Sequence, residues 1–196
     1  MVSITANKIN YVSISNNKEV SEKTLDFEFL IIALGSTYVH PFQATVYERN
    51  EQIKYMQGTL DKTKNAKRVL IVGGGAVGVE VAGELATDCP DKRVTLIAST
   101  DRLLTRMSEK FSTAALNILK SKNVEVILND RIDLKNVENF KTTKLKTQNG
   151  KEIEFDAFFV CVGGKPCTEI VKKSFPEWVD ADGFIKINGN MNVITG

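Results

Sequence analysis

The chain has 196 residues, of which 42% are hydrophobic and 26% are charged, the balance of an ordinary folded protein. Its formal net charge is only +2, so composition gives no electrostatic case for a nucleic-acid partner or an anionic membrane surface. The longest apolar run, FLIIAL at residues 29–34, is far shorter than the about 20 residues that a membrane-spanning helix needs. We therefore expect one sizeable folded core or two small ones, no nucleic-acid partner and no transmembrane segment in this chain.

The first predicted elements are strands. KINYVSIS, residues 8–15, is rich in β-branched and aromatic residues and ends at the turn pair Asn16–Asn17. A second strand is expected from Val20 toward Leu25. FEFLIIALG, residues 27–35, is continuously apolar up to a glycine, which predicts a strand buried on both faces.

Helices and strands then alternate. Apolar residues near helical spacing from Tyr47 to about Lys64 predict an amphipathic helix that breaks or ends near Gly58. The next elements alternate in type, with strands at 68–72, 93–98 and 124–128 and helices at 76–88 and 108–122. This β-α-β-α-β order predicts a Rossmann-like α/β fold with a doubly wound parallel sheet.

A hairpin is expected where the next crossover helix would stand. TKLKTQNGKEIEF, residues 143–155, alternates on both sides of Asn149–Gly150, a strong hairpin signal. We expect Leu145 and Thr147 to pair with Ile153 and Phe155, in a β-meander that replaces the helix. AFFVCVGG then predicts a buried strand, and the tail GFIKINGNMNVITG predicts a short strand and the start of another.

A glycine turn joins the strand at 68–72 to its helix. Gly73, Gly75 and Gly78 fit G-x-G-x-x-G, in which the three glycines allow a tight turn, a close pyrophosphate and close helix packing. Ala76 and Val77 begin the helix, whose free N–H groups and positive dipole end favour phosphate. The pattern predicts nucleotide binding, with a purely structural turn as the alternative.

The residues that would choose between NADH and NADPH are not those usually found. An acid that holds the ribose 2′-hydroxyl belongs about 20 residues after the turn, where this chain has Ala98. Asp101 could substitute for that acid and Arg102 could meet a 2′-phosphate, but both also fit as solvated loop residues. Selectivity stays open, and Ala98 alone predicts discrimination below about tenfold, or 1.4 kcal/mol.

The cysteines indicate the compartment. Cys89, Cys161 and Cys167 form no C-x-x-C pair, so we expect reduced thiols in a cytosol-like compartment. The first residues show no secretory h-region. The expected location is cytoplasmic, or peripheral on an intracellular membrane, and not secreted.

Four blocks, FEFLIIALGS, the glycine turn with GVE, FFVCVGGKP and NVITG, resemble in that order the two-dinucleotide-fold flavoprotein reductases of the pyridine nucleotide-disulfide type. The resemblance implies that residues 1–41 and 166–196 are parts of an FAD domain and that 42–165 form an inserted NAD(P)H domain. It also implies that the chain is an internal fragment of a longer protein.

The resemblance carries over to individual positions. It places Gly73, Gly75 and Gly78 at the NAD(P)H turn and Glu80, otherwise a plain helix-start acid, toward the nicotinamide. Gly163 and Gly164 match strand-end glycines beside the nucleotide. Gly35 lies in a segment on the FAD side, where Leu34 replaces the usual threonine.

The implied function is that of an FAD-dependent NAD(P)H oxidoreductase. Hydride would pass from NAD(P)H to flavin and on to a small-molecule electron acceptor such as a quinone. No residue pattern identifies a catalytic side chain, a metal site or an oligomeric state. The alternative is a nucleotide-binding regulatory or death-signalling module without turnover.

Overall fold

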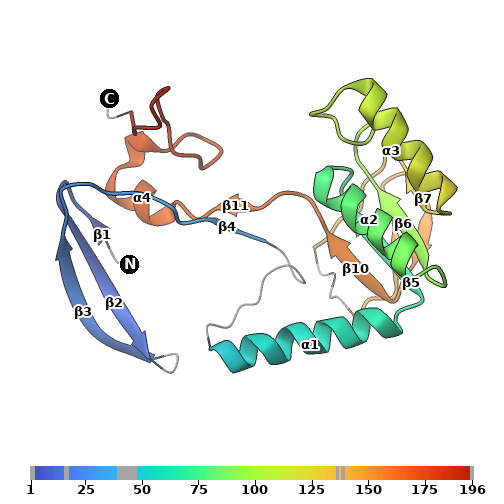
Figure 1. Ribbon diagram of the computed structural model, residues 1–196, viewed down its shortest axis with the longest axis horizontal. Helices are drawn as coiled ribbons and strands as arrows, with labels where there is room; N and C mark the ends of the chain where they lie inside the picture. The colour runs from blue at the N-terminus through green and yellow to red at the C-terminus, as the bar shows by residue number, and fades with distance from the viewer. Residues whose placement is uncertain (1–2, 16–17, 39–47, 136, 138–139, 195–196) are drawn as a thin grey trace. The chain divides into compact units, whose positions relative to one another are not determined.

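The computed structural model describes residues 3–15, 18–38, 48–135, 137 and 140–194, which form two compact units (Figure 1). The first unit contains the described residues up to Tyr38, Glu48 and Arg49, and those from Gly164 onward. The second runs from Asn50 to Gly163. The expected boundary between residues 41 and 42 and the predicted turn at Asn16–Asn17 lie outside the described residues.

A four-stranded parallel sheet in the order β10-β5-β6-β7 organises the second unit. Helices α2 (Ala76–Asp88) and α3 (Glu109–Ser121) follow β5 and β6. Because β6 and β7 extend to one side of β5 and β10 lies on the other, the strand order reverses beside β5, the position where such sheets bind ligands. The predicted parallel α/β fold is confirmed, with β5 at Arg68–Val72, β6 at Arg93–Ile97, β7 at Glu125–Ile127 and β10 at Ala157–Val160.

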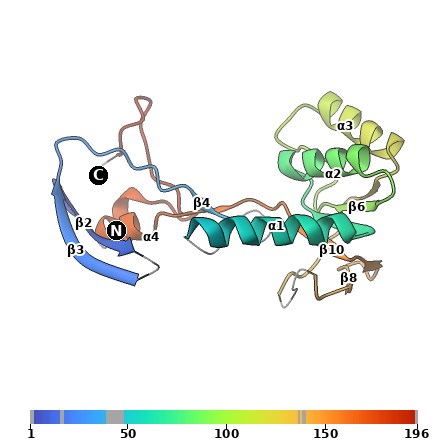
Figure 2. The ribbon, with the colours of Figure 1, turned by 60° about the horizontal axis from the view of Figure 1, so that its bottom comes forward.

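Both faces of this sheet are covered. Ile71 and Leu96 are fully buried on the face that packs against α2 and α3. On the other face Leu70 packs with Phe155 and Phe158, whose rings meet edge to face with centroids 5.8 Å apart. Figure 2 shows α2 and α3 on one side of β6 and β10, and β8 on the other.

The predicted hairpin covers that second face. Strands β8 (Lys144–Lys146) and β9 (Glu152–Glu154) pair with Leu145 opposite Ile153, as expected. The other expected pair is wrong, because Thr147 already donates across the turn to Lys151 (2.8 Å) and Phe155 donates to the Thr143 carbonyl (2.9 Å). The described residues therefore form a two-stranded hairpin at this place in the fold.

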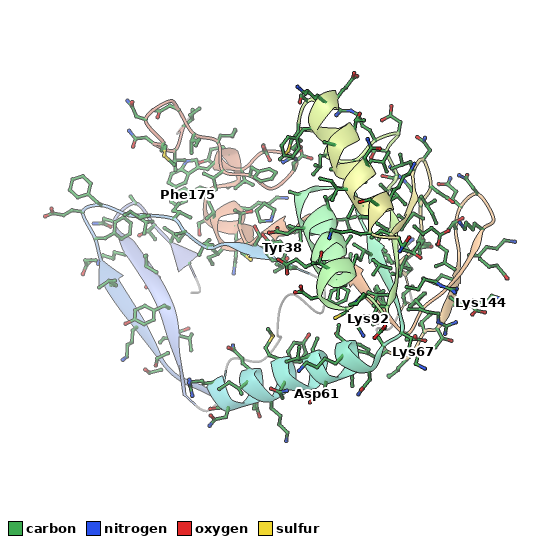
Figure 3. The ribbon with its side chains drawn as sticks, turned by 45° about the vertical axis from the view of Figure 1, so that its right-hand side comes forward. Tyr38, Asp61, Lys67, Lys92, Lys144 and Phe175 are labelled. Atoms are coloured by element: carbon green, nitrogen blue, oxygen red, sulfur yellow. The ribbon has the colours of Figure 1, made fainter. Side chains whose placement is uncertain are left out.

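Helix α1 (Arg49–Asn65) precedes β5 and runs through Gly58 without a break. The expected break is wrong because one glycine costs a helix only about 1 kcal/mol. None of its residues is buried, and apolar Ile53, Met56 and Leu60 remain about half exposed. Near the C-terminal end of α1 the Lys92 ammonium donates to the backbone carbonyls of Lys64 and Ala66 (Figure 3). A cation is favoured there because this end of the helix dipole is negative.

The first unit is smaller. An antiparallel sheet of β1 (Ser3–Ile4), β2 (Lys8–Ser15) and β3 (Lys18–Asp26) confirms both predicted N-terminal strands. Ile4, Val171 and Val179 form the centre of its core. The remaining elements are β4 (Ser36–Thr37), which pairs antiparallel with β11 (Lys165–Pro166), helix α4 (Glu169–Ser174) and the 3-10 helix η1 (Pro176–Trp178).

Two sequence predictions fail in this unit. Residues 27–35 form no strand: Leu30 and Ile32 pack on the core, while Phe29 and Ile31 are 91% and 89% exposed. Side chains on both sides of this run are apolar, but the described part of the chain packs against only one of these sides. The tail likewise forms isolated bridges, not strands, between Val179 and Ile185 and between Ile187 and Val193. No helix among the described residues is long and apolar enough to cross a membrane.

An ion-pair network joins the amino ends of β5 and β10, away from the carboxyl ends. Asp156 accepts hydrogen bonds from the N–H groups of Lys67 (3.0 Å) and Arg68 (2.8 Å) and pairs with the Arg68 guanidinium (2.7 Å). The hydrogen bond from the Arg68 side chain holds the pKa of the Asp156 carboxyl below its ordinary value of 3.8.

The pair predicts a pH-dependent contribution to stability. Because the folded pKa is the lower one, the Asp156 ion pair stabilises the fold fully above the ordinary pKa of the unfolded carboxyl, and this stabilisation is lost as pH falls through the folded pKa. We expect Asp156→Asn to cost about 1 kcal/mol at neutral pH, since a third of the side chain is exposed and the pair is screened. Urea unfolding from pH 7 to pH 2.5 should show wild type and variant converging in acid; a constant difference would contradict this.

Candidate functional site: a cavity over the glycine turn

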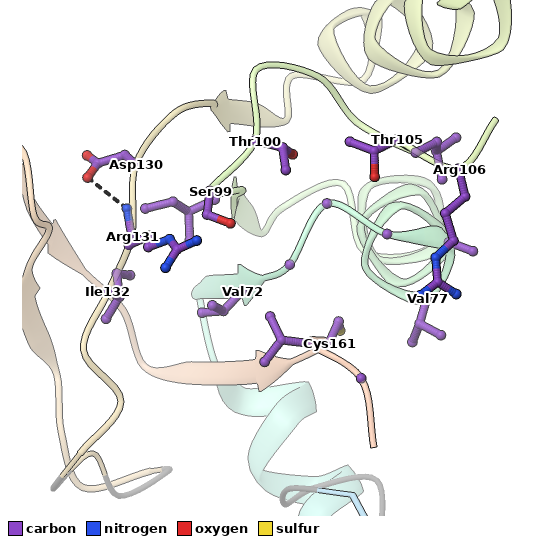
Figure 4. A pocket seen from close by; sticks show the side chains of 18 of the residues that line it. Val72, Val77, Ser99, Thr100, Thr105, Arg106, Asp130, Arg131, Ile132 and Cys161 are labelled. Carbon is purple, nitrogen blue, oxygen red and sulfur yellow. Dashed lines mark hydrogen bonds between the residues drawn. The ribbon is translucent and has the colours of Figure 1, made fainter. Parts of the chain in front are cut away.

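A cavity of about 680 Å³ lies at the carboxyl ends of the parallel strands (Figure 4). The residues that follow β5, β6, β7 and β10 line it, beginning respectively at Gly73, Ser99, Asp130 and Cys161. The cavity therefore sits where the strand order reverses beside β5. A site of this kind needs four separate segments of the chain, which only the folded sheet brings together.

Three glycines of the turn are required by the protein itself. A Cβ on Gly73, whose φ is +122°, would lie 2.7 Å from the Cys161 carbonyl oxygen. On Gly74 it would lie 2.7 Å from the Ala98 Cβ, and on Gly78 only 1.9 Å from the Gly73 carbonyl oxygen. Strand, turn and helix are thus packed too closely for any side chain at these positions.

Gly75 is different. A Cβ there would meet no protein atom within 4 Å, and its φ of −77° suits any residue. It is the N-cap of α2, yet no side chain caps that helix and no acid stands in its first turn. The first N–H groups of a helix need a partner from outside it. Open space over an uncapped, positive helix end fits the pyrophosphate of a dinucleotide.

Ala98, the position expected to face the ribose, lies outside the cavity lining. Ala98 is 2% exposed and does not line the cavity, because its backbone bonds to Ile127 and Asp130 hold it within the sheet. Ser99 and Thr100, which follow it, do line the cavity.

Neither expected loop residue lines the cavity. The Arg102 guanidinium donates to the carbonyls of Thr105 (2.9 Å) and Met107 (3.0 Å), so it holds its own loop in place. Asp101 is exposed and lies outside the lining.

The other expected positions divide between the two units. Ala76, Val77 and Gly163 line the cavity, whereas Glu80 is exposed on α2 outside it. A Cβ on Gly164 would lie 2.8 Å from the Tyr38 ring, so this glycine permits a close contact within the first unit. Gly35, with a φ of +70°, lies in that unit too and accepts a hydrogen bond from the N–H of Cys167 (3.0 Å).

Sequence reasoning missed the residues that follow β7. Asp130 and Arg131 line the cavity, and the Asp130 carboxylate accepts hydrogen bonds from the N–H groups of Arg131 (2.8 Å) and Asn149 (3.1 Å). Burial raises the pKa of Asp130, but these bonds and one from the Thr147 hydroxyl outweigh it, so the pKa lies below its ordinary value. Their position shortly after a strand was the signal that could have identified them, because the carboxyl ends of parallel strands meet at one edge of the sheet, where ligands bind.

Cys161 is part of the cavity wall but is not a reactive thiol. Burial raises its pKa to about 11, so the thiol is neutral at physiological pH and lacks the thiolate that acts as a nucleophile. All three cysteines are free. No cluster of potential metal ligands occurs among the residues that the structure describes.

The chain belongs to the pyridine nucleotide-disulphide oxidoreductase family, whose model matches residues 1–195. It is 33% identical over 192 residues to apoptosis-inducing factor homolog A of Dictyostelium discoideum, covering 87% of this chain and 47% of that protein. It is 30% identical over 179 residues to human ferroptosis suppressor protein 1, covering 87% and 48%. The chain thus spans about half the length of the curated relatives it matches.

Solved structures share the fold. Reduced CoADR-RHD of Bacillus anthracis matches with a TM-score of 0.70 at 18% identity, over 93% of this chain and 32% of that one. The water-forming NADH oxidase of Lactobacillus brevis, solved with NADH bound, matches with a TM-score of 0.65 at 20% identity, over 85% and 37%.

Proposed function

We propose that the Asn50–Gly163 unit binds NAD(P)H in an FAD-dependent oxidoreductase, and that the first unit belongs to the FAD domain. The observation that carries the proposal is Gly75, the glycine of the turn that the protein's own packing does not require. Its open face over an uncapped helix end is explained by a pyrophosphate. Family membership and the relative solved with NADH support the same reading.

Each part of the cavity then has a task. The free N–H groups at the start of α2 bind the pyrophosphate, and the missing Cβ of Gly75 lets it approach. Val77 and Cys161 supply apolar wall. When bound, nicotinamide supplies a hydride that flavin accepts, and the protein's part is to hold the nucleotide in place.

The electron acceptor we propose is a small molecule of the quinone type. Cys89, Cys161 and Cys167 form no C-x-x-C pair, so this segment offers no dithiol to carry electrons away from a flavin. The three free thiols also support an intracellular location, either cytoplasmic or peripheral on a membrane.

The test uses the complete protein loaded with FAD. Anaerobic NADH or NADPH should bleach the flavin absorbance, and a soluble quinone should restore it. Gly75→Val should leave the flavin bound but unreduced, because that residue lies on the nucleotide side. Flavin that stays oxidised in the wild type would contradict hydride transfer; flavin that is reduced but not reoxidised by quinone would contradict only the acceptor.

A further inference from the structure

Two arginine residues that line the cavity, Arg106 and Arg131, have side chains that take no part in the contacts that hold the described residues of the fold together. Within the described parts of the chain, the guanidinium groups of Arg106 and Arg131 form no hydrogen bond or ion pair. Figure 4 shows them on opposite sides of the glycine turn, with Arg106 on the side of Val77 and Arg131 on the side of Ser99. The cavity therefore offers cations at two separated places.

Arg131 is fixed beside the end of β6. The N–H of Asn129 donates to the Thr100 carbonyl (2.9 Å) and that of Asp130 to the Ala98 carbonyl (3.2 Å), so the segments after β6 and β7 are joined. The Arg131 carbonyl in turn accepts from the N–H of Gln148 (2.8 Å) in the hairpin turn. The hairpin that covers the sheet thus also holds the backbone of Arg131.

Of the described residues, this end of the cavity holds one unpaired cation, the Arg131 guanidinium, and one carboxylate, that of Asp130. Asp130 is the only acid among the described lining residues, and its carboxylate is bound to N–H groups on the backbone. Ser99 adds a hydroxyl group at the position where a selective NADH site carries an acid, whereas the Thr100 hydroxyl already donates to the Arg102 carbonyl (2.8 Å). A guanidinium beside a hydroxyl donor, with the one nearby carboxylate already hydrogen-bonded to N–H groups, is complementary to a phosphate dianion.

We infer that Arg131, with Ser99 beside it, binds the 2′-phosphate of NADPH, so that the cavity selects the phosphorylated dinucleotide over NADH. This rests on the proposed function, because the pyrophosphate must lie on the glycine turn for the ribose to reach Ser99. Ala98 considered alone predicted little discrimination between NADH and NADPH. Ala98 is buried outside the cavity lining, whereas Arg131 lines the cavity. Arg106, on the helix side, serves both nucleotides alike.

Calorimetry on the full chain tests this with four probes: NADPH, NADH, 2′,5′-ADP and 5′-AMP. Wild type should prefer each 2′-phosphorylated probe by about tenfold or more. Arg131→Ala should weaken NADPH and 2′,5′-ADP by roughly 10- to 100-fold, the range of a charge-assisted hydrogen bond, and change NADH by less than about threefold. Arg106→Ala is the matched control, which removes one charge from the same cavity and should weaken NADPH and NADH equally.

The outcomes separate the two proposals. Retained NADH binding shows that Arg131→Ala is folded, so a selective loss of the phosphorylated probes supports the assignment. Wild type that binds NADH and NADPH alike, or an Arg131→Ala variant that weakens both equally, would overturn the role of Arg131 and leave the proposed function standing. Wild type that binds none of the probes would overturn the proposed function itself.

Discussion

Gly75→Val is expected to abolish dinucleotide binding while the protein stays folded. A Cβ at this position meets no protein atom within 4 Å, and the extended backbone (φ −77°, ψ −175°) suits valine. Loss of a glycine N-cap should cost no more than about 1 kcal/mol of stability. The branched side chain would instead fill the space over the helix end, and we expect affinity for NADH and NADPH to fall more than about 100-fold, or 2.7 kcal/mol.

The measurement is calorimetric titration of both nucleotides into wild type and variant. Gly75→Ala is the graded control, because its single methyl group should weaken binding less than valine does. Thermal unfolding should give midpoints within a few degrees for all three proteins. Undiminished affinity in a folded Gly75→Val protein would contradict pyrophosphate binding at this turn.

Gly78→Ala, only three residues away, is expected to lower the stability of the fold, which Gly75→Val leaves nearly unchanged. Its Cβ would stand 1.9 Å from the Gly73 carbonyl oxygen and 3.4 Å from the Cys161 Cβ. Helix α2 would have to move away from β5, and backbone atoms cannot yield as a flexible side chain would. We expect a loss of more than about 3 kcal/mol in the free energy of unfolding of the Asn50–Gly163 unit.

Urea unfolding followed by circular dichroism measures this loss. Gly83→Ala on the same helix is the matched control, since its Cβ would make only an ordinary contact at 3.9 Å with Leu119. Alanine is also a better helix former, so this control should be neutral or slightly stabilising. A Gly78→Ala protein as stable as wild type would mean that α2 does not pack this closely on β5.

Local sequence patterns predicted the second unit well because its elements have distinct burial patterns: α3 is amphipathic, whereas β5 and β6 are buried on both faces. The spacing of apolar residues in α3 and the β-branched run of β5 each specify one structure, and the glycines between β5 and α2 specify the turn. The run at 27–35 was harder, since an apolar stretch indicates that both sides suit burial but not what covers them. The predicted helix break at Gly58 was wrong for a simpler reason, because one unfavourable residue does not end a 17-residue helix.

The residues that line the cavity were predicted from sequence only in part. Gly75, Ala76 and Val77 follow one another in the glycine motif, and Gly163 was expected from the family resemblance. The position of Arg131 in the cavity lining depends on the pairing of β6 with β7 and on a hydrogen bond from the hairpin turn. Neither contact can be located from the sequence alone. Arg102 was plausible by position, but its hydrogen bonds to loop carbonyls become visible only in the structure.

The claim that a dinucleotide lies over the glycine turn can be tested most directly by following backbone amide signals in nuclear magnetic resonance. NADPH should be titrated into the isotope-labelled chain and the amide shifts assigned to residues. The account predicts saturable shifts that are largest at Gly75, Ala76 and Val77, with further shifts at Ser99, Arg131 and Gly163. Unchanged signals at the start of α2, with any shifts confined to the other unit, would contradict it.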